Sequence, residues 1–175
     1  MTDDQQMNNK LLDAVRWVCR ARSDDDKRLI INYLSVNKDG DIAATDGYRL
    51  HKATVKTDKL PAGIYRVLKT GAVVWLDKMP DSVGKFPDYE AVIPKTADHE
   101  ETIEHNEHNE ILFAACVAAS KASGGGTYNA GYMDQAIPAD KFSGKITFLG
   151  TDELAPIMVQ HDIGTAVIVP LWIRL

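Results

Sequence analysis

The hydrophobic pattern of the first third of the chain predicts one helix followed by a meander of strands. From Lys10 to Arg22, apolar residues such as Leu11, Val15 and Val18 recur at helical spacing, opposite a mostly basic stripe. Polar residues 23–26 end this helix. In residues 28–56, apolar and polar residues then alternate on either side of two Asp-Gly turns, which are typical of tight hairpins. This stretch predicts three antiparallel strands.

The middle of the chain predicts shorter extended segments. Two further strands are expected at 64–69 and 72–76, between glycines and a proline that favour turns. Residues 85–94 are predicted to run extended, because Pro87 and Pro94 oppose a helix. Residues 95–110 lack apolar periodicity and predict a solvated linker or a long exposed loop.

The second half repeats the order of helix and then strands. Residues 111–121 are apolar on every side, which predicts a buried helix, and a weaker helix is expected at 128–137 before Pro138. Three strands follow. Their predicted ranges are 145–150, 156–161 and 165–175. The pattern indicates an α+β fold, with helices on one side of antiparallel sheets.

The amino-acid composition indicates which class of protein this is. The chain has 175 residues, of which 45% are hydrophobic and 26% charged, as expected for one compact soluble domain or two small ones. No apolar run is long enough to cross a membrane and the first nine residues are polar, which favours a cytoplasmic protein without membrane contact. Cys19 and Cys116 lie in apolar helical patterns, so buried reduced thiols are expected rather than a disulfide.

The charge is unevenly distributed. The net charge of −5 argues against a phosphate-binding protein, but residues 98–110 carry six acidic residues and no Lys or Arg. The remainder has 20 basic and 19 acidic residues, so the body of the protein is balanced.

Catalytic and metal-binding motifs are missing from the sequence. It contains no phosphate-binding loop, GxGxxG, GxSxG, HExxH or CxxC motif, so we expect no enzyme, no catalytic residue and no cofactor. His99, His105 and His108 lie among glutamates that could bind zinc or nickel, but their spacing matches no closed site. A solvated loop is favoured there, and a small metal-dependent enzyme remains a remote alternative.

Three segments together carry a resemblance to a known family. They are ATDGYRL (44–50), GKFPDYEAVIP (84–94) and the final AVIVPLWIRL (166–175). In this order they resemble the bacterial DNA polymerase sliding clamp, the β processivity subunit. Its middle domain carries an ATDGHRL-type turn and closes with a GRFPDYxxVLP-type segment, and the clamp ends in VMPMRL. The two predicted helices of the second half are similar to those of the last clamp domain.

The resemblance implies a shortened, DNA-clamp-like protein with two truncated helix-plus-strands halves. Residues 1–97 would form a half like the middle domain, and residues 98–175 an acidic linker followed by a half like the last domain. The first clamp domain has no counterpart here, and strands are missing from both halves. A phage or mobile element is the expected source.

In the family the three segments meet in one pocket that binds Gln-Leu-x-Leu-Phe-like peptides of polymerases and the clamp loader. Branched aliphatic residues and prolines suit such a cleft, because they bury Leu and Phe anchors. Alternatively, the same residues serve only as turns and core. The resemblance assigns peptide binding to Thr45, Gly47, Tyr48, Arg49, Leu50, Pro87, Val92, Val167, Ile168, Val169 and Pro170.

Function then follows from the resemblance. We expect a replication protein that tethers a polymerase or clamp loader to double-stranded DNA, with ring formation as a homo-oligomer left open. The alternative is a clamp mimic that keeps the peptide pocket without the ring and competes for host replication proteins. Phosphate contacts would come from the basic stripe of the first helix. Its residues are Lys10, Arg16, Arg20 and Arg22.

Overall fold

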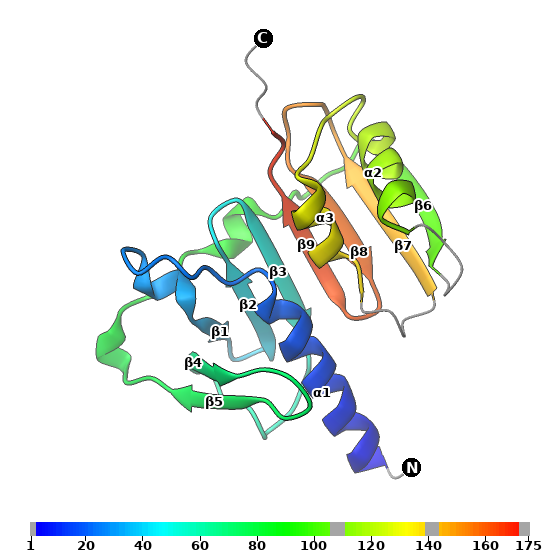
Figure 1. Ribbon diagram of the computed structural model, residues 1–175. Helices are drawn as coiled ribbons and strands as arrows, with labels where there is room; N and C mark the ends of the chain where they lie inside the picture. Colours follow the sequence, from blue (N-terminus) through cyan, green and yellow to red (C-terminus); the bar gives the residue numbers. More distant parts are fainter. Residues whose placement is uncertain (1–2, 106–110, 139–143, 172–175) are drawn as a thin grey trace. The chain divides into compact units, whose positions relative to one another are not determined.

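The computed structural model describes residues 3–105, 111–138 and 144–171. The chain divides into two compact units, 1–89 and 90–175. The assignment of 1–97 to a half like the middle clamp domain and of 98–175 to a linker and a half like the last domain stays a prediction. Each unit is an antiparallel sheet with its helices on one face (Figure 1). The predicted α+β class, with helices on one side of antiparallel sheets, is confirmed.

Unit 1 contains five described strands in the order β5-β4-β1-β2-β3, all antiparallel. The two hairpins predicted from the Asp-Gly turns are β1–β2 and β2–β3. The elements are α1 (Asp3–Cys19), η1 (Leu29–Asn32), β1 (Leu34–Val36), β2 (Asp41–Thr45), β3 (Arg49–Thr54), β4 (Gly63–Lys69), β5 (Trp75–Lys78) and η2 (Asp81–Val83).

Helix α1 packs on β2 and β3 through a face that includes Val15, Trp17 and Val18, all buried. It begins earlier than the predicted Lys10, because polar residues can extend a helix beyond the part that packs. It also ends at Cys19 rather than Arg22. The next three amides bond to carbonyls three residues back, which tightens the chain into a turn.

The segment 85–94 is extended only in part. Residues Tyr89–Val92 form a short 3-10 helix, η3, where the sequence predicted a continuous extended run. Proline restricts its own residue and the one before it. The four residues of η3 lie between the restrictions imposed by Pro87 and Pro94, so a single turn fits there.

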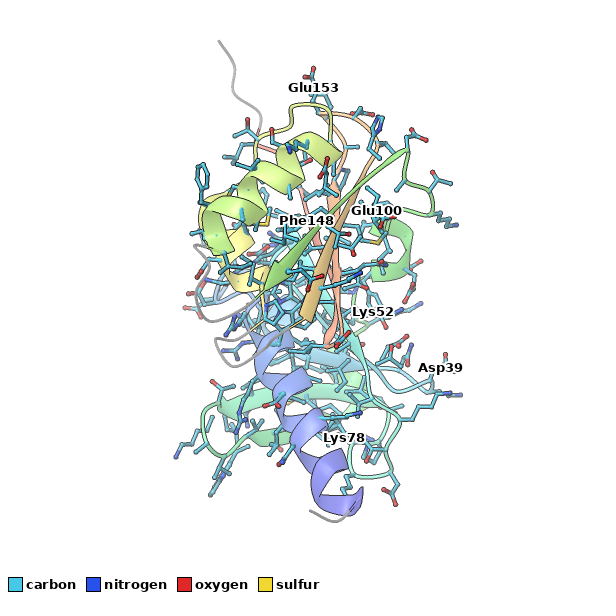
Figure 2. All side chains as sticks on the ribbon, turned by 90° about the vertical axis from the view of Figure 1, so that its right-hand side faces the viewer. Asp39, Lys52, Lys78, Glu100, Phe148 and Glu153 are labelled. Atoms are coloured by element: carbon cyan, nitrogen blue, oxygen red, sulfur yellow. The ribbon has the colours of Figure 1, made fainter. Side chains whose placement is uncertain are left out.

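Unit 2 contains four described strands in the order β9-β8-β7-β6, again antiparallel. Its helices α2 and α3 lie over one face of this sheet (Figure 1), and Phe148 (labelled in Figure 2) is fully buried in the core. The elements are β6 (His99–His105), α2 (Ile111–Ala122), α3 (Ala130–Ala136), β7 (Gly144–Gly150), β8 (Ile157–His161) and β9 (Gly164–Ile168).

Residues 99–105, within the segment predicted as a linker or exposed loop, form strand β6. It pairs with β7 along its whole length, from His99 opposite Gly150 to His105 opposite Gly144. An outer strand gains its stability from backbone hydrogen bonds on one side, so it needs no regular apolar face, and charged residues keep it from pairing with other chains. Apolar periodicity therefore could not reveal it.

The uniform apolar pattern of helix α2 predicted that it is buried on every side. In the structure only one face is buried. Its packed face is formed by small residues, whereas Phe113 is 71% exposed and Val117 is 38% exposed. The alanines allow the helix to lie close to β6 and β7, and the larger residues point away. The buried residues are Ala115, Ala118, Ala119 and Ala122.

The remaining predicted features of unit 2 and of the cysteines are met in part. Helix α3 lies within the predicted 128–137, with Asn129 accepting hydrogen bonds from the amides of Gly131 and Tyr132 as its N-cap. Strand β9 ends at Ile168, well before the predicted end of the strand. Cys19 and Cys116 are free thiols but only half-buried. None of the described helices is long and apolar enough to span a membrane.

Candidate functional site

The TDGYRL turn, residues 45–50, joins β2 to β3 and is fixed by its own side chains. The Thr45 hydroxyl donates to the Arg49 carbonyl at 2.6 Å and accepts from the Gly47 amide at 3.0 Å. Asp46 accepts from the amides of Tyr48 and Arg49, and its other oxygen pairs with Arg49 Nε at 3.0 Å. These local bonds hold the turn rigidly at the end of the hairpin.

Only some of the residues predicted to bind peptide in this turn have exposed side chains. Tyr48 is 61% exposed and available to a partner, whereas Leu50 is buried in the core of unit 1. The Arg49 side chain lies against the turn in its ion pair with Asp46, with only 9% of its surface exposed. Of these three residues, Tyr48 is therefore the side chain that the turn offers to a ligand.

Arg28 is a residue of this site that the sequence did not indicate. Its guanidinium donates to the Asp46 carbonyl at 3.3 Å, and it covers Gly47 so closely that a Cβ there would lie 2.7 Å from Nη2. Gly47 also has a φ of +94°, which favours glycine. Arg28 belongs to a different segment from the turn, and no motif connects the two.

The FPDY segment, residues 86–89, is attached to unit 1 by its two aromatic residues. Phe86 and Tyr89 are buried and meet edge to face, with ring centroids 6.2 Å apart. Pro87, between them, is exposed. The Tyr89 hydroxyl accepts from Asn37 Nδ2 at 3.4 Å, and Lys52 Nζ lies 5.9 Å from the Tyr89 ring centroid.

Asp41 is the charged centre beneath this segment. It accepts hydrogen bonds from Asn37 and Thr54, and its Oδ2 lies 3.2 Å from Lys52 Nζ (Lys52 is labelled in Figure 2). Burial acts to raise the pKa of Asp41, but the hydrogen bonds from Thr54, Asn37 and Lys52 and the Lys52 charge outweigh it. The pKa of Asp41 therefore lies below its usual value, and the carboxylate is ionised at neutral pH.

The remaining peptide-binding candidates belong to unit 2. Val92, at the end of η3, is 55% exposed, whereas Val167 and Ile168 are buried within β9. Pro170 is buried and Val169 half-buried just after the strand. Residues 172–175, on which the register of the tail depends, lie outside the described residues.

The basic stripe of α1 is partly used inside the protein. Arg16 donates through Nε to the Gly71 carbonyl at 2.7 Å and through Nη2 to the Ala72 carbonyl at 2.9 Å, and it pairs with Asp13 at 3.1 Å. Arg16 therefore connects the β4–β5 loop to the helix by hydrogen bonds. Lys10, by contrast, is exposed.

The other two cations of the stripe lie beyond the end of α1. Arg22 donates to the Asn32 carbonyl at 3.4 Å, and both Arg20 and Arg22 are half-buried. The stripe is therefore a mixed surface, in which Lys10 is exposed and the three arginines are half-buried. No group of three His, Cys, Asp or Glu that could hold a metal ion occurs within residues 3–105, 111–138 and 144–171. His108 lies outside them.

Comparison with solved structures identifies the fold. The β subunit of DNA polymerase III from Thermotoga maritima matches with a TM-score of 0.61 and 18% identity, covering 95% of this chain and 64% of that one. The chain has a sliding-clamp-like fold. The Borrelia burgdorferi β subunit matches with a TM-score of 0.62 and 13% identity, over 94% and 62% of the two chains.

A third clamp structure contains a peptide. The Helicobacter pylori β clamp bound to a DNA ligase peptide matches with a TM-score of 0.62 and 13% identity, over 93% of this chain and 63% of that one. The sliding-clamp-like chain thus spans less than two thirds of the length of these clamps. No family model matches it. No curated protein matches it either.

Within unit 1 of the sliding-clamp-like fold, two of the three sequence segments share one support, the β2–β3 hairpin. Asp41 and Thr45 lie at the two ends of β2, and Arg49 and Lys52 lie on β3. One end of the hairpin forms the TDGYRL turn, and Lys52, paired with Asp41, contacts Tyr89 of the FPDY segment. The hairpin is therefore the structural basis of the candidate site in unit 1.

Proposed function

We propose that the chain is a sliding-clamp-like replication protein that binds Gln-Leu-x-Leu-Phe-like peptides of a polymerase or clamp loader and tethers these proteins to DNA. The observation that carries the proposal is the β2–β3 hairpin, which bears the TDGYRL turn and holds the FPDY segment. Tyr48 and Pro87 remain exposed on these two segments. The peptide bound by the Helicobacter pylori clamp supports a peptide ligand for a protein of this fold.

The chemistry of the proposed contacts is apolar. In unit 1, the exposed Tyr48 and Pro87 would supply rigid apolar surface for Leu and Phe side chains, and in unit 2 the exposed Val92 would do so. Rigid residues lose little entropy on binding, whereas the peptide must become ordered. We therefore expect a dissociation constant of about 1–100 μM. Leu50 in unit 1, and Val167, Ile168 and Pro170 in unit 2, are buried and would support the surface of their own unit.

The DNA contact is proposed for unit 1, in which Lys10, Arg20 and Arg22 remain the candidates. Residues 1–89 have 15 Lys and Arg against 13 Asp and Glu, whereas residues 90–175 have 5 against 12. Arg16 is already committed to the β4–β5 loop. A contact of about three cations gives a log-log salt slope of about −3, so binding would be weak at physiological salt.

The clamp mimic is the second candidate, and the acidic charge of residues 90–175 favours it. Helix α2 offers Lys121 and helix α3 offers Asp134, which is a poor surface for phosphates. A mimic needs only the peptide site. It would bind the same partners as the host clamp and displace them from it.

The peptide experiment tests both candidates against any other function. Val92→Asp should abolish binding of a fluorescent Gln-Leu-x-Leu-Phe peptide, because a charge would replace an apolar contact, and its 55% exposure keeps the variant folded. Lys121→Ala, on the exposed side of α2, is the control and should bind normally. No polarisation change at about 100 μM wild-type protein would contradict the proposal.

Nicked circular DNA separates the two candidates. A closed ring stays on the circle at salt concentrations that remove ordinary electrostatic binders, and it leaves when the circle is linearised. A mimic should show only weak binding that is lost with rising salt and reduced by Arg20→Glu. Salt-resistant retention that depends on circularity would support the tethering clamp and eliminate the mimic.

A further inference from the structure

Three polar side chains beneath the FPDY segment form a single connected group. We propose that this group, the Asn37 cluster of Asn37, Asp41 and Lys52, is a positioning device that holds Tyr89 and thereby sets Pro87 in place for peptide recognition. The inference rests on the proposed function and adds to it the residues that prepare the binding surface.

Asn37 is oriented without ambiguity. Its Oδ1 accepts from the amides of Asp39 and Asp41, both at 2.9 Å, so its Nδ2 must point the other way. The two hydrogens of Nδ2 then reach Asp41 Oδ2 at 2.9 Å and the Tyr89 hydroxyl at 3.4 Å. One amide group therefore connects the turn between β1 and β2 with the FPDY segment.

Lys52 makes the second connection to Tyr89. Its Nζ lies 3.2 Å from Asp41 Oδ2 and 5.9 Å from the centroid of the Tyr89 ring. The carboxylate is mostly buried and keeps the ammonium group in place, and the ammonium group attracts the ring face. Tyr89 is thus held at its hydroxyl by Asn37 and at its ring by Lys52.

Pro87 depends on these contacts because it has little burial of its own. It is exposed, and the residues that anchor it are Phe86 on one side and Tyr89 on the other. Weakening the contacts of Tyr89 with Asn37 and Lys52 would loosen the segment at this end, where the packing on Phe86 would remain. A peptide would then have to order this surface as it binds, which weakens affinity.

Stability alone does not account for such a cluster. A buried ion pair contributes little more to folding than apolar residues of the same size, and often less. A polar group with directed hydrogen bonds, by contrast, selects one arrangement among several of similar compactness. The Asn37 cluster selects one path for the FPDY segment.

Two measurements on the full chain test the proposal. Hydrogen–deuterium exchange of the stretch 84–92 reads the segment itself, and polarisation of the Gln-Leu-x-Leu-Phe peptide reads affinity. The variants are Lys52→Met, which removes the charge, Lys52→Arg, which keeps it, and Tyr89→Phe, which removes only the hydroxyl. Arg66→Met is the matched control, because it breaks the exposed Arg66–Asp77 pair of 2.6 Å in the same unit.

We expect Lys52→Met and Tyr89→Phe to speed exchange in 84–92, and Lys52→Met to weaken peptide binding about five- to tenfold at a temperature where the protein is folded. Lys52→Arg should restore both readouts, and Arg66→Met should change neither. Unchanged exchange and affinity in folded Lys52→Met and Tyr89→Phe would overturn the proposal. Failure of the wild type to bind peptide would contradict the proposed function, while the exchange data would still decide whether the cluster holds the segment.

Discussion

The imidazole of His51 stacks on the indole of Trp17, with ring centroids 4.4 Å apart and ring planes 14° apart. His51 Nδ1 also lies 3.0 Å from the Trp17 carbonyl oxygen, and both residues are buried. This pair fastens α1 to β3. The hairpin that supports the TDGYRL turn and the FPDY segment is therefore held firmly against the helix.

Trp17→Ala should destabilise the protein by about 3–5 kcal/mol, because it removes a large buried ring that stacks on His51. Urea unfolding followed by circular dichroism measures the change. Leu29→Ala is a suitable control, since Leu29 is largely exposed and should change stability by less than about 0.5 kcal/mol. A loss of less than about 1 kcal/mol for Trp17→Ala would contradict this packing.

Substitutions on the two faces of α2 should differ strongly in their effect on stability. Ala119→Leu should cost about 1–3 kcal/mol, because the side chain is fully buried against the sheet and has no space to grow. Phe113→Ser should change stability by less than about 0.5 kcal/mol, since Phe113 is exposed in the isolated chain. Thermal unfolding of both variants tests the pair. A large loss for Phe113→Ser would mean that this face is covered in the protein as it exists in solution.

The lowered pKa of Asp41 predicts an acid dependence of stability. A carboxyl group whose pKa is lower in the folded than in the unfolded chain stabilises the fold above its unfolded pKa, about 3.9, and loses this effect as pH falls through the folded value. Asp41→Asn should therefore be less stable than the wild type at pH 7, with a difference that shrinks as pH falls below about 4. Denaturant unfolding at several pH values measures it. A difference independent of pH would show that Asp41 does not act through its charge.

Gly47→Ala should destabilise the protein by about 1–2 kcal/mol, because alanine is strained at a φ of +94°. The new methyl group also lies too close to the Arg28 guanidinium. In an Arg28→Ala background the steric part should disappear while the backbone part remains. Unfolding of the two single variants and the double variant separates these contributions, and full recovery in the double variant would show that backbone strain is absent.

The thiol of Cys19 should react slowly. Burial raises the pKa of Cys19 to about 11, with the Arg22 charge opposing the shift, and burial also raises the pKa of Cys116. At pH 8 only about one thousandth of Cys19 is thiolate, which is the reactive form. Labelling with iodoacetamide and mass spectrometry should find Cys19 modified far more slowly than a free cysteine in denaturant. Equal rates would contradict the burial.

Local features of the fold could be predicted from the sequence, because their causes lie within a few residues. The β2–β3 hairpin follows from alternating side chains and the Asp-Gly turn, and the end of α3 follows from Pro138. The three segments that resemble the sliding clamp likewise predicted its fold, although the matching clamp of Thermotoga maritima is only 18% identical.

Other features depend on neighbours in space, and only the tertiary structure decided them. Strand β6 forms because β7 offers it a row of backbone partners, and Phe113 is exposed because the alanines of α2 face the sheet instead. Arg16 meets the β4–β5 loop, and Lys52 meets both Asp41 and Tyr89, across distances in sequence that no motif covers. Periodicity reports which side of an element is apolar, but the fold determines what each side chain finds opposite it.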